Sequence, residues 1–257
     1  MDLVKIAYEI EKIAKEAGEL ITHHENLEIS EKSDAANIVT NMDVASQNFI
    51  IEACRKLIPN SSFYAEEEGK QELGNEYTWV IDPIDGTTNF AYDFKHSCIS
   101  IALLYQKKGK VGVVYDPYLQ ECFVGIEGKQ STLNGKAIHA AEHTLPYALV
   151  MFGTSPYNKA LADETFETAK KLFLNCRDLR RSGSAALDIC YVACGRVDVF
   201  YESQLSPWDY AAGKIIAENA QAKAHALHQD SFDYSRPIGV LFANKTCFED
   251  VLKVIEG

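Results

Sequence analysis

The chain begins with a pattern that is typical of an amphipathic helix. Apolar residues recur every three or four positions between residues 2 and 24, and Lys and Glu occupy the opposite face, which predicts a helix that packs one face on a core. A second helix is predicted to begin at Thr40 or Asn41, either of which can cap it, and to end near Leu57, because Pro59 follows. The apolar positions of the first helix are Leu3, Ile6, Ile10, Ile13, Ala17, Leu20 and Ile21.

The middle and the end of the chain carry different patterns. Residues 25–39 are polar and irregular, apart from a candidate strand at 27–29, and short apolar runs of strand length follow from residue 78 to 126. After residue 145 strands and helices alternate. A strand-rich first half and an alternating second half predict an α+β fold of layered sheets and helices. The predicted strands are 79–82, 98–106, 110–115, 121–126, 148–153, 197–201 and 238–243, and the later helices are 160–175, 184–195, 207–220 and 247–255.

Composition narrows the class of protein. A chain of 257 residues is near the upper size of one domain, and a formal net charge of -12 argues against a nucleic-acid partner. A small phosphate substrate stays compatible with this charge, because bound divalent cations reverse the local field. No apolar run reaches the length of a membrane span, and Met1–Lys5 do not begin a signal peptide. The seven cysteines form no Cys-x-x-Cys pair and are expected to be reduced thiols in a cytoplasmic protein.

The stretch from Trp79 to Phe90 carries the strongest chemical signal. Three bulky apolar residues predict a buried strand, and Asp82 and Asp85 follow it on either side of Pro83. An ordinary Asp-Pro or Asp-Gly turn explains either dipeptide alone, but it does not require two carboxylates. Because two like charges held close together are costly without a cation between them, the pattern predicts a site for a hard metal ion at the strand end.

Two further segments add carboxylates to this site. Glu66 and Glu67 precede the stretch, within a run of three glutamates that ends at Glu68. Near the C-terminal end, Ser206 and Pro207 predict the start of a helix whose first turn contains Asp209. Considered alone, an Asp at that position is explained by the helix dipole.

Together, these three segments resemble the inositol monophosphatase family of magnesium-dependent, lithium-sensitive phosphatases. The resemblance implies a layered αβαβα sandwich of the inositol monophosphatase and fructose-1,6-bisphosphatase type. It implies a single domain over 1–257, with an N-terminal α+β half to about residue 143 and a C-terminal α/β half from about 144. Further segments that match the family in order are Lys32-Ser33, Val39-Thr40, Asp43, 112–117, Asn134-Gly135-Lys136 and 183–187.

The resemblance implies a site for two or three Mg²⁺ ions. Glu67 would support the ligands indirectly, and Glu68 leaves open a register one residue later than Glu66. Lys32 would lie on a loop near the metals, although a loop lysine is usually only solvated. The first metal would be held by Glu66, Asp82 and the backbone carbonyl of Ile84, and the second by Asp82, Asp85 and Asp209.

The resemblance also implies the catalytic groups. An activated water would attack the phosphorus directly, oriented by Thr87 and Glu66, while Asp43 accepts the proton of Thr87; Asp43 is alternatively a helix cap. The backbone N–H groups of Gly86 and Thr87 would hold the phosphate at a helix start, where Thr88 would act as a cap or a phosphate ligand. The implied substrate-binding residues are Asp85, Gly86, Thr87, Thr88, Gly183, Ser184, Ala185, Glu202 and Asp209.

The expected substrate is inositol 1-phosphate or a related polyol or sugar monophosphate. Glu202 stands where inositol phosphatases place a glutamate that binds ring hydroxyls, whereas Arg180 is expected to form a structural salt bridge. Fructose 1,6-bisphosphate, the 2'-phosphate of NADP and 3'-phosphoadenosine 5'-phosphate remain alternatives. The resemblance further implies inhibition by lithium and a homodimer. In one departure from the family, Gln221-Ala222 replaces a Gly-Gly pair, which predicts a changed helix-to-strand turn.

Two rival functions remain open at this stage. One is a phosphatase of the haloacid dehalogenase type, which has a single residue between its aspartates, whereas Pro83 and Ile84 intervene here. The other is a catalytically silent metal-dependent protein that binds sugar phosphates.

Overall fold

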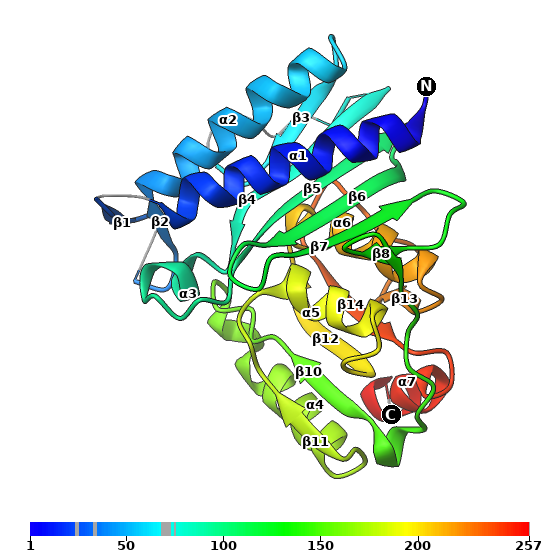
Figure 1. The fold of residues 1–257 in the computed structure, drawn as a ribbon. Helices are drawn as coiled ribbons and strands as arrows, with labels where there is room; N and C mark the ends of the chain where they lie inside the picture. Colours follow the sequence, from blue (N-terminus) through cyan, green and yellow to red (C-terminus); the bar gives the residue numbers. More distant parts are fainter. Residues whose placement is uncertain (24–25, 33–34, 68–72, 75, 257) are drawn as a thin grey trace.

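The helices and strands form five successive layers. The computed structural model describes residues 1–256 except 24–25, 33–34, 68–72 and 75. In this part of the chain two sheets alternate with three pairs of helices (Figure 1). The pairs are α1 (Leu3–Thr22) with α2 (Asn41–Leu57), α5 (Ala185–Ala193) with α6 (Pro207–Asn219), and α4 (Ala162–Phe173) with α7 (Phe248–Glu256). The expected αβαβα sandwich is therefore confirmed.

The first sheet lies between the outer pair α1 and α2 and the central pair α5 and α6. It is antiparallel except for its first two strands, which run parallel. In the described residues its strand order is β3 (Ser62–Ala65), β4 (Tyr77–Asp85), β5 (Cys98–Tyr105), β6 (Lys108–Asp116), β7 (Glu121–Ile126), β8 (Thr132–Leu133) and β9 (Lys136–Ala137).

The second sheet lies between the central helices and the pair α4 and α7. Its strand order is β11 (Asp178–Arg180), β10 (Leu149–Phe152), β12 (Val199–Leu205), β14 (Ile238–Ala243) and β13 (Lys223–Ala226). The first three strands are mutually parallel, and β14 runs antiparallel to both of its neighbours. The remaining elements are the hairpin of β1 (Ile29–Glu31) and β2 (Ile38–Thr40), the short helix α3 (Thr87–Ala91), and the 3₁₀ turns η1 (Leu145–Tyr147) and η2 (Lys159–Leu161).

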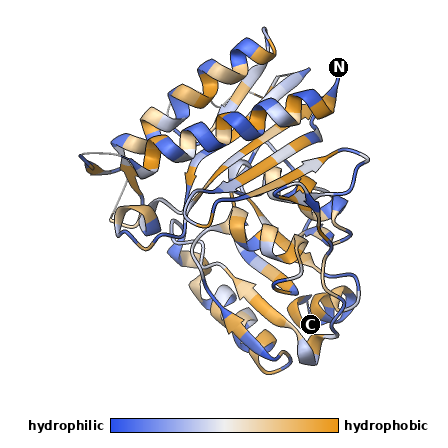
Figure 2. Ribbon diagram, in the orientation of Figure 1, coloured by the Kyte–Doolittle hydropathy of each residue, from blue (hydrophilic) through white to orange (hydrophobic). Residues whose placement is uncertain are grey.

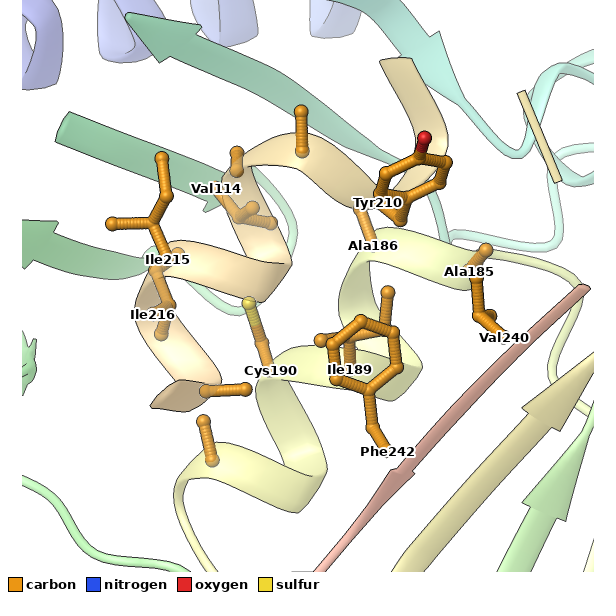
Figure 3. Packing of buried hydrophobic residues seen from close by; sticks show 14 of the residues in the cluster. Val114, Ala185, Ala186, Ile189, Cys190, Tyr210, Ile215, Ile216, Val240 and Phe242 are labelled. Carbon is orange, nitrogen blue, oxygen red and sulfur yellow. The ribbon is translucent and has the colours of Figure 1, made fainter. Parts of the chain in front are cut away.

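The central helices are apolar on both sides because each packs against two layers. Side chains of α5 and α6, such as Ile189, Cys190 and Tyr210, meet Val114 of the first sheet and Phe242 of the second (Figure 3). By contrast, α1 and α2 carry both polar and apolar residues (Figure 2), because each packs only one side against the first sheet. These patterns follow from the rule that a helix buries only the faces that contact other layers.

Two glycines let the backbone of α6 contact the backbone of the first sheet. A Cβ built on Gly112 would lie 2.4 Å from the carbonyl oxygen of Ala212, and one on Gly125 would lie 2.8 Å from Cα of Ile216. Any larger residue would push α6 away from the sheet. Because Asp209 lies in the first turn of α6, this packing also sets the position of that carboxylate.

Most predicted elements are confirmed, with ends that differ by a few residues. Thr40 caps α2, as predicted, whereas the candidate strand at 27–29 lies instead at 29–31. The expected end of β4 near Asp82 is wrong: the strand continues to Asp85, with a register shift between the two aspartates. This irregularity accommodates Pro83, which has no N–H to donate to a ladder. The strands β2, β3, β8, β9, β11 and β13 were not predicted.

Gln221 lies where the Gly-Gly pair was expected from the family pattern. Its φ is 68°, a left-handed conformation that glycine adopts more easily. The turn between α6 and β13 is therefore formed without glycine.

Candidate functional site

A cavity of about 1020 Å³ opens where the two halves of the chain meet. The β1–β2 hairpin, the end of β4, α3, and the first turns of α5 and α6 contribute to its wall. The predicted site residues that line it are Lys32, Glu66, Asp82, Ile84, Asp85, Gly86, Thr87, Thr88, Gly183, Ser184, Ala185, Glu202 and Asp209. Asp43 and Glu67 are buried and do not line the cavity, and Glu68 lies outside the described residues.

Three carboxylates converge in this cavity. One oxygen from each of Asp82, Asp85 and Asp209 lies within 4.8 Å of the other two. Asp82 and Asp85 are 2% and 6% exposed, so water screens their charges poorly. β4 supplies the first two groups and α6 the third, which shows why residues more than 120 positions apart in the sequence form one cluster.

Hydrogen bonds hold all three carboxylates in place, and Oδ1 of Asp82 accepts from the backbone N–H of Ile84 at 3.0 Å. Oδ2 of Asp85 accepts from Ser184 Oγ and from the backbone N–H of Ala186, the latter at 2.8 Å. Oδ2 of Asp209 accepts from the backbone N–H of Ser206 at 2.7 Å. Ser206 is therefore the N-cap of α6, as predicted, and Asp209 in the first turn completes the capping box and also reaches the cluster.

The electrostatics of the cluster suit a divalent cation. Burial, and then the charges of neighbouring carboxylates, raise the pKa values of Asp82 and Asp209 well above their ordinary values. Burial also raises the pKa of Asp85, although the hydrogen bonds from Ser184 and Ala186 oppose it. Carboxylate oxygens are the ligands that Mg²⁺ prefers, and a cation among them would offset their repulsion. The donor set thus fits the hard-metal site that the sequence predicts and the Mg²⁺ that the family resemblance implies.

Glu66 lies beside this cluster and contacts a cation of the chain itself. Nζ of Lys32 lies 2.9 Å from Oε1 of Glu66 and 2.6 Å from Oε1 of Glu67. Burial raises the pKa of Glu66 to about 7, although Lys32 opposes the shift. The hairpin lysine, for which simple solvation was the alternative, is thus joined to both glutamates.

Asp43 caps α2 and also makes the contact with Thr87 that the predicted proton relay requires. Its Oδ2 accepts from the backbone N–H and the hydroxyl of Thr40, at 2.7 and 2.6 Å, and so closes the cap of α2. Its Oδ1 accepts from the hydroxyl of Thr87 at 3.1 Å. Burial raises the pKa of Asp43, and the hydrogen bonds from Thr40 oppose the shift. The first residue of α3 is therefore connected to the first turn of α2.

The cavity wall carries a further buried carboxylate outside the aspartate cluster. Glu202 of β12 is 5% exposed, and its Oε1 accepts from the backbone N–H of Ser155 at 2.7 Å. Burial raises its pKa to about 7. Asp188 of α5, which is 2% exposed, lines the same wall and accepts from Ser182 Oγ at 2.5 Å.

Several residues of the cavity lining were not predicted from the sequence. Asp188, Arg181 and Tyr157 all line the cavity. Asp188 carried a usable signal, because it lies four residues after Ser184 and hence on the same helix face. Arg180, the neighbour of Arg181, forms the expected salt bridge, with Asp178 at 2.5 Å. Nothing in the local sequence indicates which of the two arginines faces the cavity.

Comparisons with known proteins agree with this geometry. The sequence model of the inositol monophosphatase family matches residues 2–256 of this chain. Inositol monophosphatase 2 of Solanum lycopersicum is 42% identical over 218 residues, which cover 80% of this chain and 82% of the relative. The inositol monophosphatase structure from Anabaena (Nostoc) sp. PCC 7120 superimposes with a TM-score of 0.88 at 32% identity, covering 100% of this chain and 97% of that one.

Some of the similar solved structures contain ligands. An IMPase/NADP phosphatase complexed with Mg²⁺ and phosphate superimposes with a TM-score of 0.86 at 26% identity, covering 99% of this chain and 96% of that one.

In the part of the chain that the structure describes, no helix combines the length and apolarity needed to cross a membrane.

Proposed function

Because the chain belongs to the inositol monophosphatase family and is a phosphatase of that family, we propose that it hydrolyses inositol 1-phosphate or a related polyol monophosphate with Mg²⁺. The observation that carries this proposal is the placement of two kinds of group in one cavity. The convergent carboxylates of Asp82, Asp85 and Asp209 line this cavity together with the buried carboxylate of Glu202. The aspartate cluster suits metal ions, which would in turn bind the phosphate, and the carboxylate of Glu202 suits hydroxyl groups.

The carboxylates would hold the metal ions. Asp82, Asp85 and Asp209 would be ligands, joined by Glu66 and the carbonyl oxygen of Ile84. Bound Mg²⁺ would neutralise the developing charge on the phosphoryl oxygens, which is the main need of a reaction this slow without a catalyst. The relative solved with Mg²⁺ and phosphate supports this choice of ion. Binding of two or three ions, inhibition by lithium, a homodimer and a cytoplasmic location stay predictions.

Thr87 would orient the attacking water. Its hydroxyl proton is directed at Asp43 Oδ1 or at the carbonyl oxygen of Ile84, each at 3.1 Å. The lone pairs of Thr87 Oγ1 therefore remain free to accept a hydrogen bond from water. Glu66, whose carboxylate lies beside the aspartate cluster, would orient the same water together with Thr87. The phosphate would lie against Gly86, Thr87 and Thr88.

The test of this function is phosphate release across a substrate panel. The purified protein is expected to release phosphate with Mg²⁺, to lose this activity in EDTA, and to prefer inositol 1-phosphate. The panel includes fructose 1,6-bisphosphate, NADP and 3'-phosphoadenosine 5'-phosphate. NADP is the strongest competitor, because one similar structure is described as an IMPase/NADP phosphatase. Strongest release from NADP would retain the metal site and overturn the polyol substrate.

Arg180 and Arg181 provide a prediction about the part of the cavity that would bind the polyol. Arg181 lines the cavity, and its charge opposes the raised pKa of Glu202. Nη2 of Arg181 donates to Thr154 Oγ1 at 3.2 Å. The other N–H groups of the guanidinium would donate to a substrate hydroxyl. Arg181→Ala is expected to raise KM for inositol 1-phosphate about tenfold, the effect of losing one hydrogen bond to a charged group. Steady-state kinetics measure this change.

The neighbouring arginine is the matched control. Arg180 pairs with Asp178 and does not line the cavity, so Arg180→Ala is expected to leave KM within about twofold of the wild-type value. Equal effects of the two substitutions would contradict a contact between Arg181 and the substrate.

A further inference from the structure

The segment after β10 leaves space for the carboxylate of Glu202. The backbone N–H of Gly153 donates to the carbonyl oxygen of Tyr201 at 2.9 Å, so the segment runs alongside β12. A Cβ built on Gly153 would lie 1.8 Å from Oε2 and 2.0 Å from Cδ of Glu202. The φ of Gly153 is outside the left-handed region. Glycine is therefore required here for space and not for backbone conformation.

Ser155, on the same segment, holds the other oxygen of this carboxylate. Its backbone N–H donates to Oε1 of Glu202 at 2.7 Å. The side chain of Ser155 binds both backbone groups of Gln204, accepting from the N–H and donating to the carbonyl oxygen, each at 3.0 Å. Ser155 is 4% exposed and has a φ of 42°, which is uncommon for a non-glycine residue. The surrounding bonds must therefore maintain this conformation.

We propose that Gly153 is a positioning residue that determines where Glu202 meets the alcohol part of the substrate. Ser155 fixes Oε1 by a hydrogen bond, and the absence of a side chain at Gly153 lets Oε2 lie against the backbone. This inference rests on the proposed function, which assigns Glu202 to the substrate hydroxyls. The group that a Cβ would displace is the flexible end of a glutamate side chain. Gly153→Ala is therefore expected to move the carboxylate without unfolding the protein.

The test compares two substrates in a double-mutant cycle. Gly153→Ala is expected to lower kcat/KM for inositol 1-phosphate about 10- to 100-fold, as expected when a charge-assisted hydrogen bond is lost, mainly through KM. Hydrolysis of p-nitrophenyl phosphate, which has no hydroxyl groups on its leaving group, is expected to stay within about twofold of wild type. In a Glu202→Ala background, where no carboxylate occupies the space, adding Gly153→Ala is expected to have no further effect.

A second glycine is the matched control. A Cβ built on Gly74 would also meet a polar side chain, at 2.2 Å from Oγ and 2.8 Å from Cβ of Ser62, and Gly74 does not line the cavity. Gly74→Ala is expected to leave both substrates unaffected. Equal losses on both substrates with Gly153→Ala, or the same loss with and without Glu202, would overturn the proposal.

Amide hydrogen exchange at Ser155 separates this inference from the proposed function. If Gly153→Ala moves the carboxylate, the Ser155 N–H loses its acceptor and is expected to exchange faster, as it would in Glu202→Ala. Unchanged exchange would overturn the positioning of Glu202 by Gly153, whichever substrate is used. Faster exchange in an enzyme that shows no preference for inositol 1-phosphate would leave the positioning intact and refute the polyol substrate.

Discussion

Asp85→Asn is expected to lower kcat/KM for phosphate release roughly 10³-fold, as is typical when a group that stabilises transition-state charge is lost. Asn keeps the shape of the side chain and can still accept the hydrogen bond from the Ala186 N–H, which Asp85 accepts at 2.8 Å. What it removes is one negative charge from three carboxylates whose oxygens lie within 4.8 Å. Weaker metal binding should appear as a higher Mg²⁺ concentration for half-maximal activity, which a Mg²⁺ titration measures.

Asp116 provides the matched control for this substitution. It is also buried, at 1% exposed, and its Oδ1 accepts from the N–H groups of Tyr118 and Leu119 at 2.8 and 3.0 Å. It does not line the cavity, so Asp116→Asn is expected to change kcat/KM by less than about twofold. Wild-type activity in Asp85→Asn, or an equal loss in a folded Asp116→Asn, would show that the metal site has been placed wrongly.

The parts of the molecule that could be predicted from the sequence are those with local signals. Helical periodicity determines α1, because its burial follows a repeat within one segment. Asp82 and Asp85 were identifiable because two carboxylates around Pro83 have no simple explanation as a turn. Comparison with the family then connected them to Asp209, and α6 does bring Asp209 to the same cavity.

The parts that could not be predicted depend on contacts between distant segments. β11 and β13 are three and four residues long, too short for a periodic pattern, and they are strands only because a neighbour pairs with them. Which arginine faces the cavity depends on the register of β11 against β10, in which Met151 lies opposite Arg180. The clash that restricts position 153 likewise arises from Glu202, 49 residues later. Local sequence contains none of this information.

Contacts with a neighbouring strand also explain why the end of β4 was predicted wrongly. A proline after an apolar run usually marks the end of a strand, which is why the strand was expected to stop near Asp82. β4 instead continues beyond Pro83, and Asp85 pairs with Cys98 after the register shift. Both aspartates therefore belong to a strand of the sheet, which holds them more rigidly than a free turn would.

Removal of metal should make the stability of the protein depend on pH in an unusual direction. Burial raises the pKa values of Asp82, Asp85 and Asp209 in the folded state. The charges of neighbouring carboxylates raise the pKa values of Asp82 and Asp209 further. Between the unfolded value near 4 and these raised values, the folded protein binds more protons than the unfolded chain. The free energy of unfolding therefore falls as pH rises through this window. In EDTA, the unfolding temperature is expected to decrease from pH 5 to pH 8.

Magnesium should reverse this loss, because it binds the ionised carboxylates. At about 100 times its dissociation constant a ligand adds about 2.7 kcal/mol to the free energy of unfolding, and proton competition weakens this gain at low pH. The difference in unfolding temperature between Mg²⁺ and EDTA is thus expected to widen from pH 5 to pH 8, as scanning calorimetry can measure. Asp85→Asn removes one charge from the cluster, so it should both flatten the EDTA profile and narrow the difference. A difference that is constant with pH, or equal in wild type and Asp85→Asn, would mean that the metal does not bind at these carboxylates.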